Sequence, residues 1–432
     1  PVAIVAGGIS RFDLPRYELA EELVAEAFHE LLEDVPDLKV KDIQNHIASY
    51  FSDHFEQQLA MHWIINDYIG LSSKPVIRVE NGGGTPLAAV VAGWWSVASG
   101  AYDLCLVTGW EKMSEVHTAK VNEFISCASD TDFEFPVGGF YSGYYASMAT
   151  RHMYLYGDTE EDLARIAVKN RNNSLENPYA QWRRQYGKKL TVEDVLHSRL
   201  VAWPYKVLDC CLVSDGAAVL LLASEAWARR LTDKPVWITG VGMGSDTMRP
   251  GDRIDNPAWP GRYPEAEKRY PAIPSRPRAA YPEMTNLASV RVAAQKAYQM
   301  AGIRNPSQEL DLCEIQDPFD GIELAMYEDL MLCEQGEGKR LVREGQTELG
   351  GAIPVNVSGG SEGQGHPVGA TLIAQTVHAL WQLRGDIEKK FGSPKMQVPH
   401  AQTALIQSHG GVGAAGAVCI LQRERRTPRG RR

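Results

Sequence analysis

The sequence predicts an α/β fold made of two similar halves, and three observations support this prediction. Short apolar runs typical of strands alternate with amphipathic runs typical of helices. The same order of runs occurs twice along the 432 residues. In each copy a glycine-rich turn joins a strand to a helix, first as "VENGGG" (79–84) and then as "NVSGG" (356–360). We therefore expect a ligand site where the two turns meet, since open α/β folds bind ligands at such junctions.

The elements of the first half set the order that the second half repeats. In the first half we predict strands at 1–8, 46–51, 75–80, 103–111 and 217–224, and helices at 18–34 and 85–100. In the second half we predict strands at 235–244, 310–319, 353–357, 403–411 and 416–423, and helices at 286–302 and 371–386.

Two insertions interrupt the repeat. Residues 112–206 are rich in aromatic and charged side chains, and we expect them to form a helical loop domain over the site. Residues 247–283 are rich in proline, which is typical of an extended excursion or a partner-binding loop. The expected division is a first half of 1–111 and 207–230, a second half of 231–432, and a basic tail at 424–432.

Charge and cysteine content exclude several classes of function. Lys plus Arg is 44 and Asp plus Glu is 54, and the resulting charge of −10 argues against nucleic acid as a partner. The seven cysteines show neither a CxxC pair nor zinc-type spacing, so no metal site is expected. Their odd number and the lack of an export signal predict a reducing, cytoplasmic location. No apolar stretch approaches the roughly 18 residues of a membrane span.

Several motifs resemble those of the thiolase superfamily. "NVSGGSEGQGHPVGAT" resembles the thiolase turn in which Gly-His-Pro-x-Gly-Ala precedes a helix, and "EIQDPF" resembles a strand end of the sterol-carrier-type thiolases. "IQSHGGVGAAGAV" stands where thiolases have a C-terminal glycine-rich loop, and "LDCCLVSDGAAVLLLAS" resembles the strand that closes their first half. The resemblance covers nearly the whole chain. It implies the thiolase fold, in which two α/β halves form five αβαβα layers with a helical loop domain.

The chain departs from the thiolase pattern at the chemistry. Thiolases carry a nucleophilic cysteine in a pattern like Val-Glu-x-x-Cys-x-x-Gly, and alignment on Val79-Glu80 puts that cysteine at Gly83. The second thiolase cysteine falls near Gln407 or Ser408. Without the acyl-accepting sulfur, no covalent acyl-enzyme can form at Gly83.

A glycine run at this place resembles the thiolase-like aldolases that cleave steroid side-chain CoA thioesters. The segment "ATRHMYLYGDTEEDLARIAVKNR" and the doublet in "LDCCLVSDG" are also similar to theirs. Those aldolases replace the Gly-His-Pro motif with a tyrosine-bearing segment, whereas this chain keeps His366. The resemblance implies a homodimer, an accessory protein with an OB fold and a zinc ribbon, and coenzyme A as part of the substrate, with no covalently bound cofactor.

Three residues are candidates for the catalytic groups. His366 lies in a glycine-lined turn before a helix, where it could donate a hydrogen bond to a thioester oxygen as enolate charge develops. His409 lies in the C-terminal loop, and a histidine there suits proton transfer at neutral pH. Asp317 ends a strand and could orient a water molecule or His366, or it could be a buried structural aspartate.

The glycine turns and one aromatic segment supply candidates for binding. Backbone N–H groups at a helix N-terminus can hold a carbonyl or alkoxide oxygen. The candidates for this thioester-binding role are Asn81, Gly83, Gly84 and Gly411. The aromatic segment "GGFYSGYYASMATRHM" offers Tyr141, Tyr144 and Tyr145 as walls of the acyl pocket or as acid–base groups.

Three functions are compatible with these residues. The first is retro-aldol cleavage of a β-hydroxyacyl-CoA, which needs a base, a stabilised enolate and a proton donor but no nucleophile. The second is acyl transfer by an unusual nucleophile, for which Cys127 is the candidate outside the expected core strands. The third is a non-catalytic subunit that binds CoA thioesters in a larger complex.

Overall fold

The computed structural model describes residues 1–250 and 284–424. The proline-rich excursion predicted at 247–283 lies, from residue 251 on, outside the described residues, and so does the basic tail from residue 425. Over the described part of the chain, no helix is both long enough and apolar enough to cross a membrane.

A mixed sheet of nine strands runs through the molecule in the order β3-β2-β4-β7-β1-β8-β11-β10-β9. The first half contributes β1 (Val2–Ile9), β2 (Asn45–Ser49), β3 (Val76–Val79), β4 (Leu104–Lys112) and β7 (Asp215–Ser224). The second half contributes β8 (Val236–Ser245), β9 (Leu312–Ile315), β10 (Thr403–Gly410) and β11 (Ala415–Gln422). The two halves join where β1 pairs with β8 through Ala3–Trp237 and Ile4–Val236.

The internal repeat is visible in the pairing of the strands on either side of this junction. In the first half β1 pairs antiparallel with β7, β7 pairs antiparallel with β4, and β4 pairs parallel with β2. In the second half β8 pairs antiparallel with β11, β11 pairs antiparallel with β10, and β10 pairs parallel with β9. The prediction of two similar α/β halves is confirmed.

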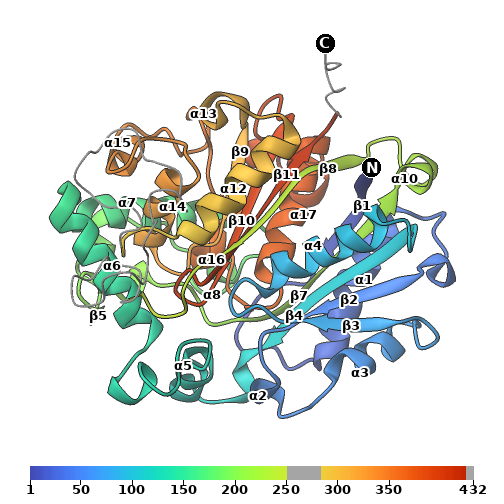
Figure 1. Cartoon of the computed structure of the whole chain (residues 1–432), viewed down its shortest axis with the longest axis horizontal. Helices are drawn as coiled ribbons and strands as arrows, with labels where there is room; N and C mark the ends of the chain where they lie inside the picture. Colours follow the sequence, from blue (N-terminus) through green and yellow to red (C-terminus); the bar gives the residue numbers. More distant parts are fainter. Residues whose placement is uncertain (251–283, 425–432) are drawn as a thin grey trace, which may run out of the picture.

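Four long helices complete the five layers. Helix α1 (Ala20–Asp34) packs on β1, β4 and β7, and α12 (Ala288–Ala301) packs on β8, β10 and β11. Helices α4 (Thr85–Ala98) and α17 (Thr371–Arg384) contact each other and strands of both halves, so they form a central layer between the two halves of the sheet (Figure 1). All fourteen residues of α17 are buried. The αβαβα arrangement that we expected is therefore present.

Small residues allow the helices to approach the sheet closely. A Cβ atom at Gly93 of α4 would stand 2.7 Å from a methyl group of Val107, and a side chain at Gly8 of β1 would collide with the backbone of α1 at Ala27. Helix α1 buries an apolar stripe of Leu23, Val24, Ala27, Phe28 and Leu31, spaced as an amphipathic helix requires.

The segment between β4 and β7 lies at one side of the molecule, drawn in teal and green at the left and lower left of Figure 1. Its helices are α5 (Thr118–Ser126), α6 (Tyr141–Tyr156), α7 (Glu160–Ser174), α8 (Gln181–Gln185) and α9 (Val192–Leu196). A small hairpin of β5 (Leu200–Ala202) and β6 (Tyr205–Lys206) follows them. The other helices are α2 (Asp53–Glu56), α3 (Met61–Tyr68), α10 (Glu225–Leu231), α13 (Pro306–Glu309), α14 (Asp320–Asp329), α15 (Gly338–Arg343), α16 (Gly360–Gly363) and α18 (Ile387–Phe391).

The strand predicted at 353–357 is wrong. Val355 forms a single parallel bridge with Cys313 instead of a ladder. Pro354 has no N–H to donate, and Asn356 has a left-handed backbone with φ 53°. In this conformation the Asn356 side-chain oxygen accepts a hydrogen bond from the N–H of Ile315 at 2.8 Å. The described residues of the second half therefore contribute four strands to the sheet, where the first half contributes five.

Candidate active site

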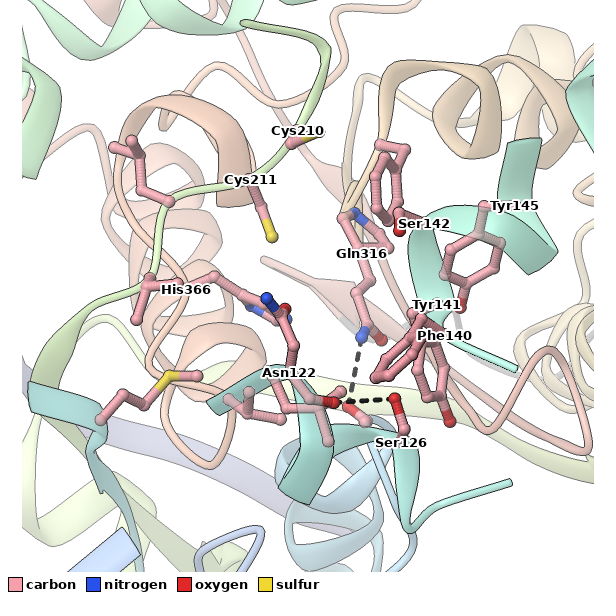
Figure 2. A pocket seen from close by; sticks show the side chains of 18 of the residues that line it. Asn122, Ser126, Phe140, Tyr141, Ser142, Tyr145, Cys210, Cys211, Gln316 and His366 are labelled. Carbon is pink, nitrogen blue, oxygen red and sulfur yellow. Dashed lines mark hydrogen bonds between the residues drawn. The ribbon is translucent and has the colours of Figure 1, made fainter. Parts of the chain in front are cut away.

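A cavity of about 330 Å³ lies where the two glycine turns and the helices of residues 113–206 meet. Figure 2 shows part of its wall, with polar groups of the second half facing aromatic side chains of α6. Its lining includes Gly83, Asn122, Ser126, Tyr141, Tyr145, Cys210, Cys211, Gln316, Phe319, His366, His409 and Gly411. The two halves and the segment between β4 and β7 thus all contribute to one site.

The first glycine turn connects the end of β3 to α4. The N–H of Gly84 donates to the Asn81 carbonyl at 3.1 Å, and the N–H of Asn81 donates to Thr85 Oγ1 at 2.8 Å. Gly82 has φ 56°, a conformation that favours glycine. Asn81 and Gly84 shape the turn without being among the described lining residues, whereas Gly83 lines the cavity.

Gly83 lies close to polar groups of the second half. A Cβ atom built on it would lie 3.1 Å from Gln316 Nε2 and 3.2 Å from the His409 carbonyl oxygen. Gly83 is not one of the residues with positive φ, so its backbone conformation does not demand glycine. A side chain at this position would therefore face the polar groups of the second half.

His366 lies in the second glycine turn, and its backbone is held from the first half. The His366 N–H donates to Ser214 Oγ at 2.8 Å and to the Leu212 carbonyl at 3.1 Å. The ring of His366 lines the cavity (Figure 2). Burial lowers the pKa of His366 to about 4, so the ring is neutral at pH 7.

The position of the ring proton of His366 depends on its neighbours. Nδ1 lies 2.9 Å from Thr371 Oγ1. The Thr371 hydroxyl donates to the Pro367 carbonyl at 3.0 Å. With that bond in place Nδ1 donates to Thr371 Oγ1, and the ring proton moves to Nε2 only in the tautomer in which the Thr371 hydroxyl turns to Nδ1. In that second tautomer the neutral ring of His366 is a hydrogen-bond donor toward the cavity.

Gln316 forms hydrogen bonds with His409, with Ser408 and with the Gly83 turn. Its Oε1 accepts hydrogen bonds from the N–H of His409 at 2.8 Å and from Ser408 Oγ at 2.9 Å, and its Nε2 donates to the Gly83 carbonyl at 3.3 Å. The sequence pattern predicted a catalytic role for its neighbour Asp317 and none for Gln316. The available signal was its place at the carboxyl end of the strand Leu312–Ile315, where α/β folds carry their functional groups.

His409 and Tyr145 form a hydrogen-bonded pair in the cavity wall. His409 Nε2 lies 3.0 Å from the Tyr145 hydroxyl, and His409 Nδ1 lies 3.3 Å from Gln407 Nε2. Because an amide nitrogen only donates, Nδ1 accepts and the ring proton of neutral His409 is on Nε2, directed at the Tyr145 oxygen. The Tyr145 hydroxyl can in turn donate to the carbonyl of Gly411, 3.4 Å away.

Asp317 is not among the described residues that line the cavity. Its carboxylate accepts the N–H groups of Ser361 and Glu362 at 2.6 and 3.3 Å and the side-chain amide of Asn170 at 3.0 Å. Burial, and then the nearby Glu323 carboxylate, raise the pKa of Asp317 well above its ordinary value. In this position Asp317 fixes the turn that leads to His366.

The three tyrosine candidates divide by position. Tyr141 and Tyr145 line the cavity, whereas Tyr144 is not among its described lining residues. The ring of Tyr144 packs edge-on against that of Tyr141, with the ring centroids 6.0 Å apart. The ring of Tyr145 is tilted against that of Tyr141, with the ring centroids 5.8 Å apart. All three lie in the first two turns of α6, so this helix presents one aromatic wall to the site.

The thiols that line the cavity belong to other cysteines than Cys127, the nucleophile candidate of the sequence. Cys127 is exposed and is not among the described residues that line the cavity. Cys210 and Cys211 line it, and Figure 2 shows the Cys211 sulfur directed inward on the same side as His366. Burial raises the pKa of the Cys211 thiol to about 12, which keeps it protonated at neutral pH.

The five-layer fold and the cavity between its glycine turns define an enzyme of the thiolase class. The family description "Thiolase, N-terminal domain" matches residues 2–226, and "Thiolase C-terminal domain-like" matches residues 274–423. The chain belongs to the thiolase family and is an acyl-CoA enzyme of that family.

Named relatives and solved structures agree with this assignment. The chain is similar to the acetyl-CoA acetyltransferase of Methanothermobacter thermautotrophicus, with 36% identity over 369 residues and 85% of each chain covered. It is 30% identical over 432 residues to sterol carrier protein 2 of Bos taurus, covering 98% of this chain and 72% of that protein. The structure titled "Ltp2-ChsH2(DUF35) aldolase" superimposes with a TM-score of 0.76 at 24% identity, over 99% of this chain and 98% of that one. At that identity the likeness is one of fold.

Proposed function

We propose that the chain cleaves a β-hydroxyacyl-CoA by a retro-aldol reaction that needs no free coenzyme A. The β-hydroxyl group loses its proton and becomes a carbonyl. The Cα–Cβ bond breaks, and its electron pair passes to the thioester as an enolate. The enolate then takes a proton at Cα, so the products are a shorter acyl-CoA and a ketone or an aldehyde.

The observation that carries this proposal is the absence of a side chain at Gly83. A side chain there would meet Gln316 Nε2 and the His409 carbonyl, and glycine supplies no nucleophile. The adjoining cavity of about 330 Å³, which Gly83 lines, gives room for a branched or bulky β-carbon. Thiolysis through a covalent acyl-enzyme requires an activated nucleophile, whereas retro-aldol cleavage does not.

His366 is the proposed donor to the thioester oxygen. Its ring is neutral, and its turn is fixed by Ser214 and Asp317. The proposal places the ring proton on Nε2, in the tautomer in which Nδ1 accepts from the Thr371 hydroxyl. A preorganised donor of this kind stabilises the enolate oxygen without having to reorient as the charge develops. Backbone N–H groups of the Gly83 turn at the start of α4 are the second proposed source of donors.

The pair of Tyr145 and His409 is proposed to handle the proton. In this proposal Tyr145 enters the step as a phenolate, whose oxygen accepts a hydrogen bond from His409 Nε2. The phenolate takes the proton of the substrate β-hydroxyl, and the resulting phenol gives that proton to Cα after the bond breaks, which restores the phenolate. In this proposal His409 acts through Tyr145.

The test is a product analysis with the purified full chain. A β-hydroxyacyl-CoA with a tertiary β-carbon is incubated without free coenzyme A, and a β-ketoacyl-CoA is incubated with and without it. We expect a shorter acyl-CoA plus a ketone in the first tube, detected by mass spectrometry. Cleavage only of the β-keto compound, and only with coenzyme A, contradicts the proposal. No turnover of either compound, with acyl-CoA still bound, would favour a non-catalytic subunit.

Acyl transfer is the second candidate function, because a thiol does face the cavity and relatives are named acetyl-CoA acetyltransferase. The candidate nucleophile for this reaction is Cys211 rather than Cys127. The raised pKa of Cys211 keeps its thiol protonated, which argues against a nucleophilic role. The variant Cys211→Ser separates the two candidates: it abolishes thiolysis if Cys211 carries the acyl group, and it leaves retro-aldol cleavage within about twofold of wild type if it only lines the wall.

A homodimer and an accessory protein complete the proposal. Strand β3 is an edge of the nine-stranded sheet, with Ile77 58% exposed, and Trp63 nearby in sequence on α3 is 65% exposed. A second copy covering this edge would pair its free strand groups. We also infer a small partner protein with an OB fold and a zinc ribbon. Sedimentation of the chain alone and after co-expression with such a protein tests both assemblies.

A further inference from the structure

Arg199 is the one charged side chain among the described residues that line the cavity. The remaining described lining consists of apolar and aromatic residues, two cysteines, two histidines, glycine, serine, asparagine and glutamine. Arg199 is exposed, so its charge lies at the solvent-facing side of the cavity, where an anionic ligand would meet it on entering.

The hairpin directs Arg199 toward the cavity. Arg199 immediately precedes β5, and its carbonyl accepts the N–H of Val207 at 2.9 Å, which closes the base of the hairpin. Alternate residues of a strand share one face, and Arg199 and Val201 both line the cavity. Strand β5 contacts α6 at the edge of the molecule (Figure 1).

The guanidinium group of Arg199 has no partner of its own in the described part of the chain. No described carboxylate lies within 4.0 Å of it, and its side chain donates no hydrogen bond to any described residue. Other arginines of the same segment are paired: Arg165 with Glu161 at 2.5 Å, and Arg184 with Asp13 at 2.8 Å. The donors of Arg199 are therefore free to meet an anionic oxygen.

We propose that Arg199 binds an anionic group of the substrate, either a carboxylate on the acyl part or a phosphate of coenzyme A. The planar fork of a guanidinium suits both groups, because each offers two coplanar acceptor oxygens. The proposal deepens the proposed function, since it names a recognition element for the same CoA thioester. Arg199 would fix one end of the substrate while the thioester meets Gly83 and His366.

The test measures binding of thioesters that cannot react, so that it does not depend on the reaction catalysed. Four ligands are titrated calorimetrically into wild type and Arg199→Gln: hexanoyl-CoA, adipoyl-CoA, hexanoyl-pantetheine and adipoyl-pantetheine. The pantetheine thioesters lack the nucleotide phosphates, and only the adipoyl compounds carry a carboxylate. Arg304→Gln is the matched control, because Arg304 is exposed and is not among the described lining residues.

Loss of a charged hydrogen-bond partner is expected to weaken binding about tenfold to a hundredfold. Weakening of both CoA thioesters, with hexanoyl-pantetheine unchanged, identifies a phosphate as the anion. Weakening confined to the two adipoyl ligands identifies the acyl carboxylate. Equal affinities of wild type and Arg199→Gln for all four ligands, or equal losses in Arg304→Gln, overturn the proposal. If binding behaves as expected but no β-hydroxyacyl-CoA is cleaved, the reaction proposed above fails and the role of Arg199 stands.

Discussion

The two glycine turns of this protein occupy equivalent places in the two halves but are held very differently. The first turn, at Asn81–Gly84, is closed by local hydrogen bonds to Thr85, accepts one hydrogen bond from Gln316, and packs against the backbone of Gly410 and Gly411. The second turn, which leads to His366, is anchored by buried groups from distant parts of the chain.

Three buried carboxylates hold the second turn. Asp317 accepts from Ser361 and Glu362, Glu314 accepts from Ser358, and Glu111 of the first half accepts from Gly369 at 3.0 Å. The first turn lacks the nucleophile expected of its family, and the second keeps its histidine. The first turn thus has no side chain at Gly83, whereas the second presents His366 to the cavity from a firmly anchored backbone.

Replacement of His366 should have the largest effect. The variant His366→Ala removes the neutral donor from the rigid turn, and we expect kcat to fall about 10²- to 10³-fold, as for other oxyanion donors. Steady-state kinetics with a β-hydroxyacyl-CoA measure this loss, and circular dichroism checks that the fold is intact. A fall of less than threefold would mean that the second turn is purely structural.

The pair Gly360→Ala and Gly83→Ala tests the difference in rigidity directly. Gly360 has φ 59°, and a Cβ atom there would collide with the Asp317 carboxylate. We expect the Gly360→Ala variant to lower the free energy of unfolding by about 3 kcal/mol or more, because the new methyl group is both strained and overpacked. The methyl group added in Gly83→Ala would contact only the flexible end of Gln316 and a carbonyl oxygen. We therefore expect this variant to lower the free energy of unfolding by about 1 kcal/mol. Urea denaturation compares the two, and equal losses would contradict the comparison.

The variant Gly83→Cys tests whether the first turn still has the geometry for a nucleophile. Made in a Cys211→Ser background, it should react with iodoacetamide and gain the mass of an acyl group after exposure to acetyl-CoA. Retro-aldol turnover should fall about tenfold, because the side chain occupies the space proposed for the β-carbon. Gly83→Ala in the same background shows the steric part alone. Absence of labelling in the folded variant would show that the turn no longer presents this position to the ligand.

The smallest effect should be that of pH on the rate that His366 contributes. Burial lowers the pKa of His366 from 6.5 to about 4, so the ring is a neutral donor at pH 5 as well as at pH 7. The ratio of the wild-type rate to the His366→Ala rate should change by less than about twofold between these two pH values. A histidine of ordinary pKa would be mostly protonated at pH 5. A ratio that changes severalfold would therefore indicate that His366 acts as a base.

The repeat and the layers were predictable from sequence because they depend on hydrophobic periodicity and on glycine turns. His366, His409, Gly83 and Tyr145 were also found, since each stands in a recognisable motif or glycine-rich segment. Gln316 was missed because a glutamine at a strand end carries no signal of its own, and its role depends on the long-range contact with His409. Arg199 was missed for a similar reason, because hairpin register decides which way its side chain points.

The central layer has a consequence for how the chain can be divided. Helix α17 belongs to the second half, yet it contacts β1 and β7 of the first half as well as α4, and all of its residues are buried. Each half on its own would expose an apolar face as long as this helix. The two repeats, although similar, are therefore one cooperative folding unit, and genes for the separate halves should yield aggregated protein unless both are made together.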